Sequence, residues 1–590
     1  MPPGSPQRLG AASVRAGSLC LVLVLAALAM GALMGGARAG APGGPGGAGQ
    51  QGNASEAGLA GAGVSGDRGV DVGVDVHWFA PFLDHSSFGG EAAGLVLGGL
   101  LRGGVVRPGQ LHIGLLQDRC EDQLLAPPAS GAEAAAAAAA GGGGSGPPAG
   151  RSGIADPSGG VGDDREERAA HHQLLALHSR PASPAIVVRV CHNLPPYLGR
   201  PAPRWASCEP CPPPGHPVRW AVARAMAETD RIPASFVTAL NSMDEVWVPA
   251  PASARVLRDS GVRVPLTELP PAVDAAGELD PDAVVPLQLP PPGCVQVFGP
   301  PGRPPARPYV FVSVFKWEAR KGHDVLIPAF LRQFGPRAEG ATGAAGAAAG
   351  AAGAGGAAAA GADQELHGEE DAGAAAEWGE GGAAGGAELY IVTKPFLQPQ
   401  PQPQPQSGQS IADAVGAWAQ AATGPQGGGR LDRRRAPRVY LLSGHLPRQQ
   451  YVRLLAAADA FVLPTRGEGW GLPIIEAMAL GLPVIATNWS GPTAYLDELV
   501  GYPLSYQLSP VPPSEPWWFQ GSNWAEPSEH HLRRLLAHVS GSAEGRREAA
   551  ARGAAARRRV LQHYSFSAAA ERLRRELNLI VAATGGPQGP

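Results

Sequence analysis

The chain has 590 residues, enough for two or more domains, and a net charge of −4 without any long run of like charges, so nothing indicates nucleic-acid binding. Its 83 glycines and 61 prolines make up about a quarter of the residues, close to the level of low-complexity sequence. The excess is local, in segments with too little apolar side chain to offset the entropy of ordering. We therefore expect a disordered stem at 41–69 and disordered insertions at 127–165, 337–388 and 397–436.

Residues 1–40 have the composition of a secretory signal. Arg8 and Arg15 precede the apolar stretch "LCLVLVLAALAMGALMGG", and small residues follow it at 37–39. The segment is either a cleaved signal peptide or an uncleaved single-pass anchor, and its length favours the anchor, because signal-peptide cores run ~7–15 residues. We expect the rest of the chain in the lumen of the Golgi or ER, with a secreted or organellar protein as the alternative.

The cysteine pairing stays open in the sequence. Cys208 and Cys211 in "CEPC" could form a strained disulfide, belong to a metal site or do neither. A zinc site needs four ligands, and only His216 lies near in the sequence, so zinc is the weaker reading.

Outside the insertions, the chain divides into two blocks in which short β-branched runs alternate with helical patterns. The first block, 70–290, has apolar helical spacing after "DHSSFGG" and in "ASARVLRDSGV", and strand-like runs in "VDVGVDVHWF", "LHIGLL", "AIVVRVC" and "DEVWVP". The second block, 295–527, has helical spacing in "KGHDVLIPAFLRQF", "RQQYVRLLAAADA" and "PIIEAMAL", and strand-like runs in "YVFVSVF", "LYIVT", "RVYLLSG", "FVLP" and "PVIAT". Residues 528–582 are predicted to be C-terminal helices. The alternation predicts an α/β protein with two Rossmann-like domains facing each other across a cleft.

Residues 461–491 hold the most informative pattern. "AFVLP" reads as a strand, "TRGEGWG" as the loop at its carboxyl end, and "LPIIEAMALG" as the helix that follows. Ligands of such sheets bind at this edge, where amides of a loop and a helix N-terminus can hold a phosphate. Glu468 in the loop and Glu476 in the first helical turn accept hydrogen bonds only, which suits the hydroxyl groups of a sugar. The combination fits a nucleotide sugar, with the sugar at Glu468, the diphosphate at the amides and the ribose at Glu476.

These residues resemble the Glu-x7-Glu motif of the retaining glycosyltransferases of family 4, the glycosyl transferases group 1, which have the GT-B fold. Further landmarks are similar and lie in the family's order: "ETDRIPASFVTALNSMDEVWVP", "AVDAAGELDP", "SVFKWEARKGHDVLIPAF" and "SGHLPRQQYVRLLAAADAFVLP". In the second of these, Leu279 stands where the family usually has an aromatic residue. The resemblance covers about 70–582, apart from the insertions.

The resemblance implies roles for individual residues. Glu468 would contact the transferred sugar, Glu476 the ribose, and Lys321 the diphosphate leaving group. Lys316 takes the second basic position, where the family often has arginine, and Arg320 is a neighbour that competes for the role. Gly444 lies in the segment similar to the border of the nucleobase pocket, and His192 is a candidate sugar contact. The remaining candidate donor-binding residues are backbone groups of glycine-rich loops: Gly89, Gly90, Gly469, Trp470, Gly471 and Leu472.

The implied activity is transfer of a hexose-type sugar, with retention, from a nucleotide-sugar donor to a glycan, glycoprotein or lipid acceptor. No cofactor and no metal are expected, and Glu468 is expected to position the sugar and stabilise charge rather than act as a nucleophile. Two other hypotheses stay open: a catalytically silent GT-B relative that binds a glycan or a protein partner, and a different GT-B enzyme such as a phosphorylase or an epimerase. The donor nucleotide is not identified by the sequence, since specificity depends on pocket shape.

Overall fold

The computed structural model describes residues 72, 74–80, 91–115, 165–178, 188–192, 198, 211, 218–304, 306–335, 386–395, 413, 415–416, 434–444 and 446–585. The predicted signal segment, the stem, Gly89 and Gly90 lie outside these residues, as does most of each predicted insertion. No helix among the described residues is long and apolar enough to cross a bilayer.

The first block forms a six-stranded sheet in which every pairing is parallel, in the order β2-β1-β3-β4-β5-β6. The strands are β1 (Val76–Ala80), β2 (Leu111–Leu115), β3 (Val188–His192), β4 (Trp220–Arg224), β5 (Glu245–Val248) and β6 (Leu266–Glu268). Successive side chains alternate between two cores: Trp78 packs on one face of the sheet and Phe79 on the other. A strand buried on both faces in this way is typical of a parallel sheet covered by helices.

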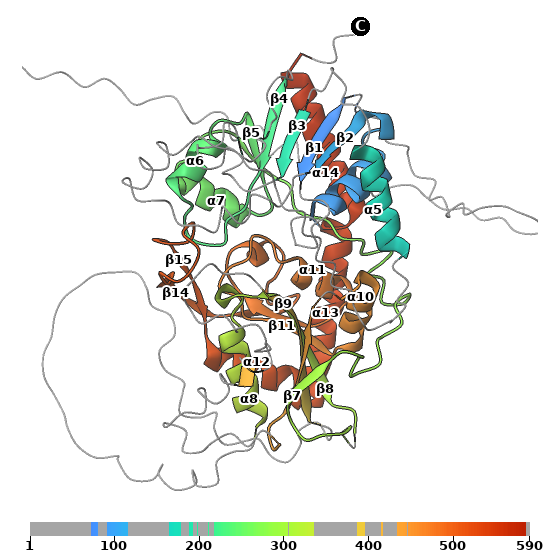
Figure 1. The fold of residues 1–590 in the computed structure, drawn as a ribbon, viewed down its shortest axis with the longest axis vertical. Helices are drawn as coiled ribbons and strands as arrows, with labels where there is room; N and C mark the ends of the chain where they lie inside the picture. Colours follow the sequence, from blue (N-terminus) through green and yellow to red (C-terminus); the bar gives the residue numbers. More distant parts are fainter. Residues whose placement is uncertain are drawn as a thin grey trace, which may run out of the picture. The chain divides into compact units, whose positions relative to one another are not determined.

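Helices cover both faces of this sheet. One face packs against η1 (Gly94–Arg102), which continues a helical turn that starts at residue 91, and against α14 (Phe566–Ala583) (Figure 1). The helices α6 (Ala234–Leu240) and α7 (Pro251–Ser260) pack on the other core, and α5 (Arg165–His178) contacts β2. A short η2 (Pro108–Gln110) leads into β2. Since α14 is the last helix of the chain, the first core is completed by the C-terminus.

The second block forms a seven-stranded sheet in the order β13-β12-β11-β8-β9-β10-β7, parallel except for β7. Its strands are β7 (Val295–Phe298), β8 (Tyr309–Trp317), β9 (Ala387–Pro395), β10 (Arg438–Ser443), β11 (Ala460–Leu463), β12 (Val484–Thr487) and β13 (Tyr502–Leu504). The helices of this block are η6 (Ala319–Lys321), α8 (His323–Phe334), α10 (Arg448–Ala457), α11 (Leu472–Ala479) and η8 (Gly491–Ala494). One large apolar core joins them, with Phe311, Phe461 and Ile475 fully buried.

A two-stranded antiparallel ribbon, β14 (Tyr506–Pro510) and β15 (Asn523–Pro527), follows the second sheet. Next come α12 (Glu529–Gly541) and α13 (Ala543–His563), which pack on α8 and α11, and then α14. Ser528, Ser542 and Ser565 each cap the helix that follows with a hydroxyl that accepts from the backbone amide three residues on. Such caps allow α13 and α14 each to begin within three residues of the end of the preceding helix.

The predicted α/β architecture, with two doubly wound and mainly parallel sheets, is confirmed. The predicted helices and strands of both blocks are present, with β9 starting inside the expected second insertion. The strand β4 was not predicted, because "WAVAR" contains alanine and arginine, which have little strand preference. The antiparallel β7, α5 and the β14–β15 ribbon were not predicted either.

Candidate active site

The site predicted from the sequence lies where the strand order of the second sheet reverses. The chain runs from β8 outward through β9 and β10, then returns to place β11 on the other side of β8. Lys321 follows β8 and Glu468 follows β11, so both loops leave the carboxyl edge of the sheet from neighbouring strands. Such a switch point is where doubly wound sheets bind ligands.

The two loops are locked together at their backbones. The amide of Arg466 donates to the carbonyl oxygen of Arg320 at 2.6 Å, and the Thr465 hydroxyl donates to the same oxygen at 3.2 Å. Gly322 has a φ of 69°, and a Cβ at this position would lie 1.8 Å from the carbonyl oxygen of Pro464. Only glycine allows so close an approach, so the "RKGHD" turn is required to bring Lys321 to the second loop.

Lys321 and Glu468 form a two-point ion pair. The ammonium Nζ of Lys321 lies 2.7 Å from Oε1 and 2.8 Å from Oε2 of Glu468. The two side chains are 13% and 8% exposed, so the pair is partly open to solvent and within reach of a ligand. Burial raises the pKa of Glu468, but Lys321 and Arg320 outweigh it and hold the pKa below its usual value. Glu468 is therefore ionised at neutral pH.

Arg320 is the second cation of this cluster. Its guanidinium donates to the carbonyl oxygen of Gly467 at 2.5 Å, lies 3.4 Å from Glu318 and comes to 4.0 Å from Glu468. Burial lowers the pKa of Arg320, but the surrounding carboxylates outweigh burial and raise the pKa above its usual value. The guanidinium therefore stays charged. Lys316 lies at the eighth position of β8, half-buried, so of the two candidates for the second basic role the structure brings Arg320 to Glu468.

The backbone of Glu468 is held by Ser490. The Ser490 hydroxyl accepts from the Glu468 amide at 2.9 Å and donates to the Glu468 carbonyl oxygen at 2.8 Å, and the amide of Gly491 donates to the same oxygen at 2.9 Å. Ser490 has a φ of 55° and a ψ of −132°, a strained conformation for a residue with a side chain. This strain is tolerated because the three bonds fix the loop on which Glu468 lies.

The next residues present unused backbone donors. Within the described part of the chain, no group accepts a hydrogen bond from the amides of Gly469, Trp470, Gly471 or Leu472. They immediately precede or open α11, whose N-terminus carries partial positive charge. Three of these residues are buried with the loop, and the Trp470 side chain packs edge-to-face against Tyr495 and Tyr564. Trp470 therefore packs in the core, while its amide remains available as a donor.

Glu476 lies in a separate network four residues further on. It is the fifth residue of α11, just past the first turn, and its carboxylate accepts from Arg448 at 2.5 Å and from the Tyr451 hydroxyl at 2.6 Å. Arg448 also pairs with Glu278, near the end of the first block, at 2.7 Å and 3.2 Å. Each oxygen of Glu476 thus has one partner and retains a lone pair for a ligand hydroxyl. Among the described residues, no hydrogen bond or ion pair links this network directly to the Lys321–Glu468 pair.

The remaining candidates lie elsewhere. Gly444 ends β10 with a φ of 127°, and its amide donates to Thr393 at 3.1 Å. His192 is the last residue of β3 and fully buried, with Nε2 3.7 Å from Oε1 of Glu91. Glu91 in turn accepts from Arg224 at 2.6 Å and 2.8 Å, so His192 belongs to a buried ion cluster of the first sheet. Burial lowers the pKa of His192 by more than Glu91 raises it. The lowered pKa keeps the imidazole neutral at pH 7.

Several residues of the site were not predicted: Glu228, Glu278, Arg448, Tyr451 and Ser490. Arg448 and Tyr451 lie three residues apart on one face of α10, but such spacing is common on any helix. Glu228 stands in "ETDRIP", one of the family-like stretches, yet a single acid in a loop carries no signal of its own. Their partners are distant in the sequence, so only the fold reveals them.

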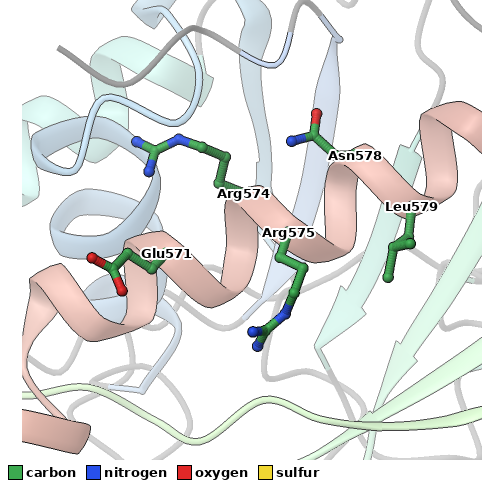
Figure 2. A pocket seen from close by; sticks show the side chains of 5 residues that line it. All are labelled: Glu571, Arg574, Arg575, Asn578 and Leu579. Atoms are coloured by element: carbon green, nitrogen blue, oxygen red, sulfur yellow. The ribbon is translucent and has the colours of Figure 1, made fainter. Parts of the chain in front are cut away.

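The described surface has a separate depression on α14. It is lined by Glu571, Arg574, Arg575, Asn578 and Leu579, all from one helix, as Figure 2 shows. None of these residues belongs to the loops after β8 and β11, so the depression is not the predicted donor site.

Part of the second block is similar in sequence to known glycosyltransferases. The family model described as "Glycosyl transferases group 1" matches residues 420–504. The chain is 45% identical over 58 residues to the O-antigen chain mannosyltransferase B of Escherichia coli, and 44% identical over 52 residues to the putative teichuronic acid biosynthesis glycosyltransferase TuaC of Bacillus subtilis. These segments span 10% and 9% of this chain, and only 14% and 13% of those relatives.

Solved structures with a similar arrangement are distant in sequence. Anabaena Alr3699/HepE in complex with UDP and glucose has a TM-score of 0.44 and 11% identity, covering 86% of this chain and 100% of that one. A glycosyltransferase from Rickettsia africae has a TM-score of 0.39 and 13% identity, covering 67% and 77%. The matched segment 420–504 contains Glu468, Glu476 and the amides between them, and it identifies the chain as carrying the glycosyl transferases group 1 signature recognised from its sequence.

Proposed function

We propose that this chain is a retaining glycosyltransferase that moves a hexose-type sugar from a nucleotide-sugar donor to a glycan, glycoprotein or lipid acceptor. The observation that carries the proposal is the Lys321–Glu468 pair at the switch point of the second sheet, close in the chain to four consecutive amides that have no acceptor among the described residues. A cation and free amides suit a diphosphate, while a carboxylate suits the hydroxyl groups of the sugar.

The proposed reaction needs no group beyond these residues, the donor and the acceptor. The acceptor hydroxyl oxygen bonds to the anomeric carbon on the face from which the diphosphate departs, and the bond from that carbon to the phosphate oxygen breaks. The departing phosphate oxygen takes the hydroxyl proton. Lys321, Arg320 and the amides at 469–472 stabilise the developing negative charge, and Glu468 positions the sugar ring. Glu476, held rigid by Arg448 and Tyr451, orients the ribose.

We also propose that the chain acts in the lumen of the secretory pathway, anchored by residues 1–40. Support comes from the first block, where Cys191 at the end of β3 and Cys211 form a disulfide with a Cα–Cα distance of 5.8 Å. Disulfides persist in oxidising compartments and are rare in the cytosol. The pairing also resolves the "CEPC" motif, since Cys211 bonds to Cys191 rather than to its neighbour.

Thermal unfolding in the presence of UDP-, GDP- and ADP-linked sugars tests the proposal. A ligand that binds only the folded state raises its stability, by about 2.7 kcal/mol at a hundredfold excess over its Kd, so the true donor should raise the Tm most. Glu476→Ala should abolish this protection. Glu529→Ala, which removes an acid from an exposed pair with Arg332, is the matched control and should retain it.

Each outcome separates the hypotheses. If no nucleotide sugar protects the wild-type chain, the transferase proposal is wrong. Protection without release of nucleoside diphosphate would instead identify a catalytically silent binding protein. Unchanged protection in Glu476→Ala would refute the ribose role of Glu476.

A further inference from the structure

A loop of the first block reaches the Lys321–Glu468 pair. Residues 225–233 follow β4, and the indole Nε1 of Trp489 donates to the carbonyl oxygen of Glu228 at 3.2 Å. Two residues on, the Asp230 carboxylate accepts from both the amide and the side-chain amide of Asn523, each at 2.7 Å. The loop is thus held to the second block at Glu228 and at Asp230.

Glycines bring this loop directly against the loop of Glu468. A Cβ at Gly467 would lie 2.1 Å from the carbonyl oxygen of Glu228, and one at Gly469 would lie 2.0 Å from the sulfur of Met226. Any side chain at Gly467 would push the Glu228 backbone away. The glycines on either side of Glu468 therefore serve to seat residues 226–228 beside it.

The Glu228 carboxylate has acceptor capacity left over. Its nearest described cation is Arg320 at 3.7 Å, too far for a hydrogen bond, and its side chain is 22% exposed. Within the described residues no donor bonds to it, whereas Glu468 accepts two bonds from Lys321 and Glu476 accepts one each from Arg448 and Tyr451. Of these three acids, Glu228 is the one without a hydrogen-bond partner.

We propose that Glu228 holds the acceptor, its carboxylate accepting a hydrogen bond from an acceptor hydroxyl group next to the one that attacks the sugar positioned by Glu468. This inference rests on the proposed transferase function and adds a role for the first block in the reaction. A carboxylate would repel the donor diphosphate, so a neutral hydroxyl is the chemically suited partner. Glu228 orients the acceptor only, because the proton of the attacking hydroxyl leaves with the diphosphate.

The charges around Glu228 also make its protonation a measurable variable. It faces Arg320, Lys321, Glu318 and Glu468. Burial and the two neighbouring acids raise the pKa of Glu228, whereas the two cations lower it. The net effect is a raised pKa. Because only the ionised form is a pure acceptor, turnover should fall as the pH drops through this raised pKa.

The test compares Glu228→Gln with the wild-type chain, using the nucleotide sugar that gives the largest thermal protection. Release of nucleoside diphosphate is followed with water as the acceptor and with a panel of methyl glycosides. Loss of one charge-assisted hydrogen bond predicts turnover about 10- to 100-fold slower in Glu228→Gln, with donor protection unchanged. The acidic limb of the wild-type pH profile should disappear, and Glu228→Asp should recover part of the rate. Asp259→Asn, the same charge change at an exposed position of α7, is the control and should behave as wild type.

Two results would overturn the inference. Glu228→Gln could keep a wild-type rate and pH profile, or it could lose donor protection as fully as Glu476→Ala, which would make Glu228 a donor ligand. If the wild-type chain shows neither protection nor turnover, the proposed transferase function fails and this role falls with it.

Discussion

The two sheets each carry a cluster of charged side chains at the point where their strand order reverses, and the clusters differ in how completely they are satisfied. In the first sheet, Glu91 is bonded twice by Arg224, and His192 lies 3.7 Å away, with side chains only 0–3% exposed. In the second sheet, Lys321 and Glu468 are paired but 13% and 8% exposed. Nearby are amides and the Glu228 carboxylate, which have no hydrogen-bond partner among the described residues.

The difference separates a closed structural cluster from one that still has hydrogen-bonding capacity for a ligand. A buried carboxylate with its counter-ion at 2.6 Å has little capacity left for a ligand, and it fixes the start of the helix at residue 91 against β4. A partly open pair beside unused donors and acceptors has that capacity. Strand topology alone would nominate both sites, and the state of the hydrogen bonds decides between them.

The largest effect is expected from breaking the closed cluster. Glu91→Gln leaves the Arg224 guanidinium buried without a counter-charge, which should lower the free energy of unfolding by about 3–5 kcal/mol at pH 7, measured by urea unfolding. Burial raises the pKa of Glu91, but Arg224 and His192 outweigh it and bring the pKa down from 4.5 to about 2. A depressed pKa stabilises the fold above the unfolded-state value, so the difference between wild type and variant should shrink as the pH falls from 4.5 toward 2.

An exposed pair is the control for that experiment. The Arg102 side chain, which pairs with Asp274, is 61% exposed. Arg102→Ala should therefore lower the free energy of unfolding by less than about 1 kcal/mol. Equal losses in the two variants would contradict the view that the first cluster is a buried structural element.

The next largest effect is expected in the open cluster, and on turnover. Glu468→Gln keeps the shape of the side chain but removes the charge that pairs with Lys321, and turnover should fall about 10²- to 10³-fold. Steady-state release of nucleoside diphosphate measures this, with the urea midpoint recorded in parallel. A variant with a wild-type rate would remove Glu468 from the reaction.

A smaller effect is expected from Ser490. Ser490→Ala removes the hydroxyl that bonds the amide and carbonyl of Glu468, which should cost about 1–3 kcal/mol of stability and loosen the loop. Turnover should fall by more than donor affinity, because Glu468 loses its fixed position while Glu476 keeps both of its partners. Equal losses in turnover and affinity would argue against a positioning role.

The second block could be predicted closely because its information is local. Strand, glycine-rich loop, proline-started helix and both glutamates lie within residues 461–491, and Lys321 follows a single buried strand. The helix α11 begins at Leu472, as the position of Pro473 predicted. The strand pattern of the first block was also recognisable, except for β4 and β6.

The rest depends on contacts between distant residues. Arg224 and Glu91 are 133 positions apart, and Arg448 and Glu278 are 170 apart. The Cys191–Cys211 bond could not be selected from the six cysteines of the sequence, and the 4.0 Å approach of Arg320 to Glu468 joins two loops far apart in the chain. The local conformational preferences of the sequence do not predict these pairings, since each forms only when the sheets are assembled.

The central claim is that the donor diphosphate lies between Lys321 and the amides at 469–472. The most direct test is the affinity for a nucleoside diphosphate and for its parent nucleoside, measured by titration calorimetry on the wild-type chain and Lys321→Met. Loss of a charged hydrogen bond predicts an affinity for the diphosphate at least about tenfold weaker in the variant, with the affinity for the nucleoside unchanged. Equal affinities of variant and wild type for the diphosphate, or an equal loss for both ligands, would contradict the claim.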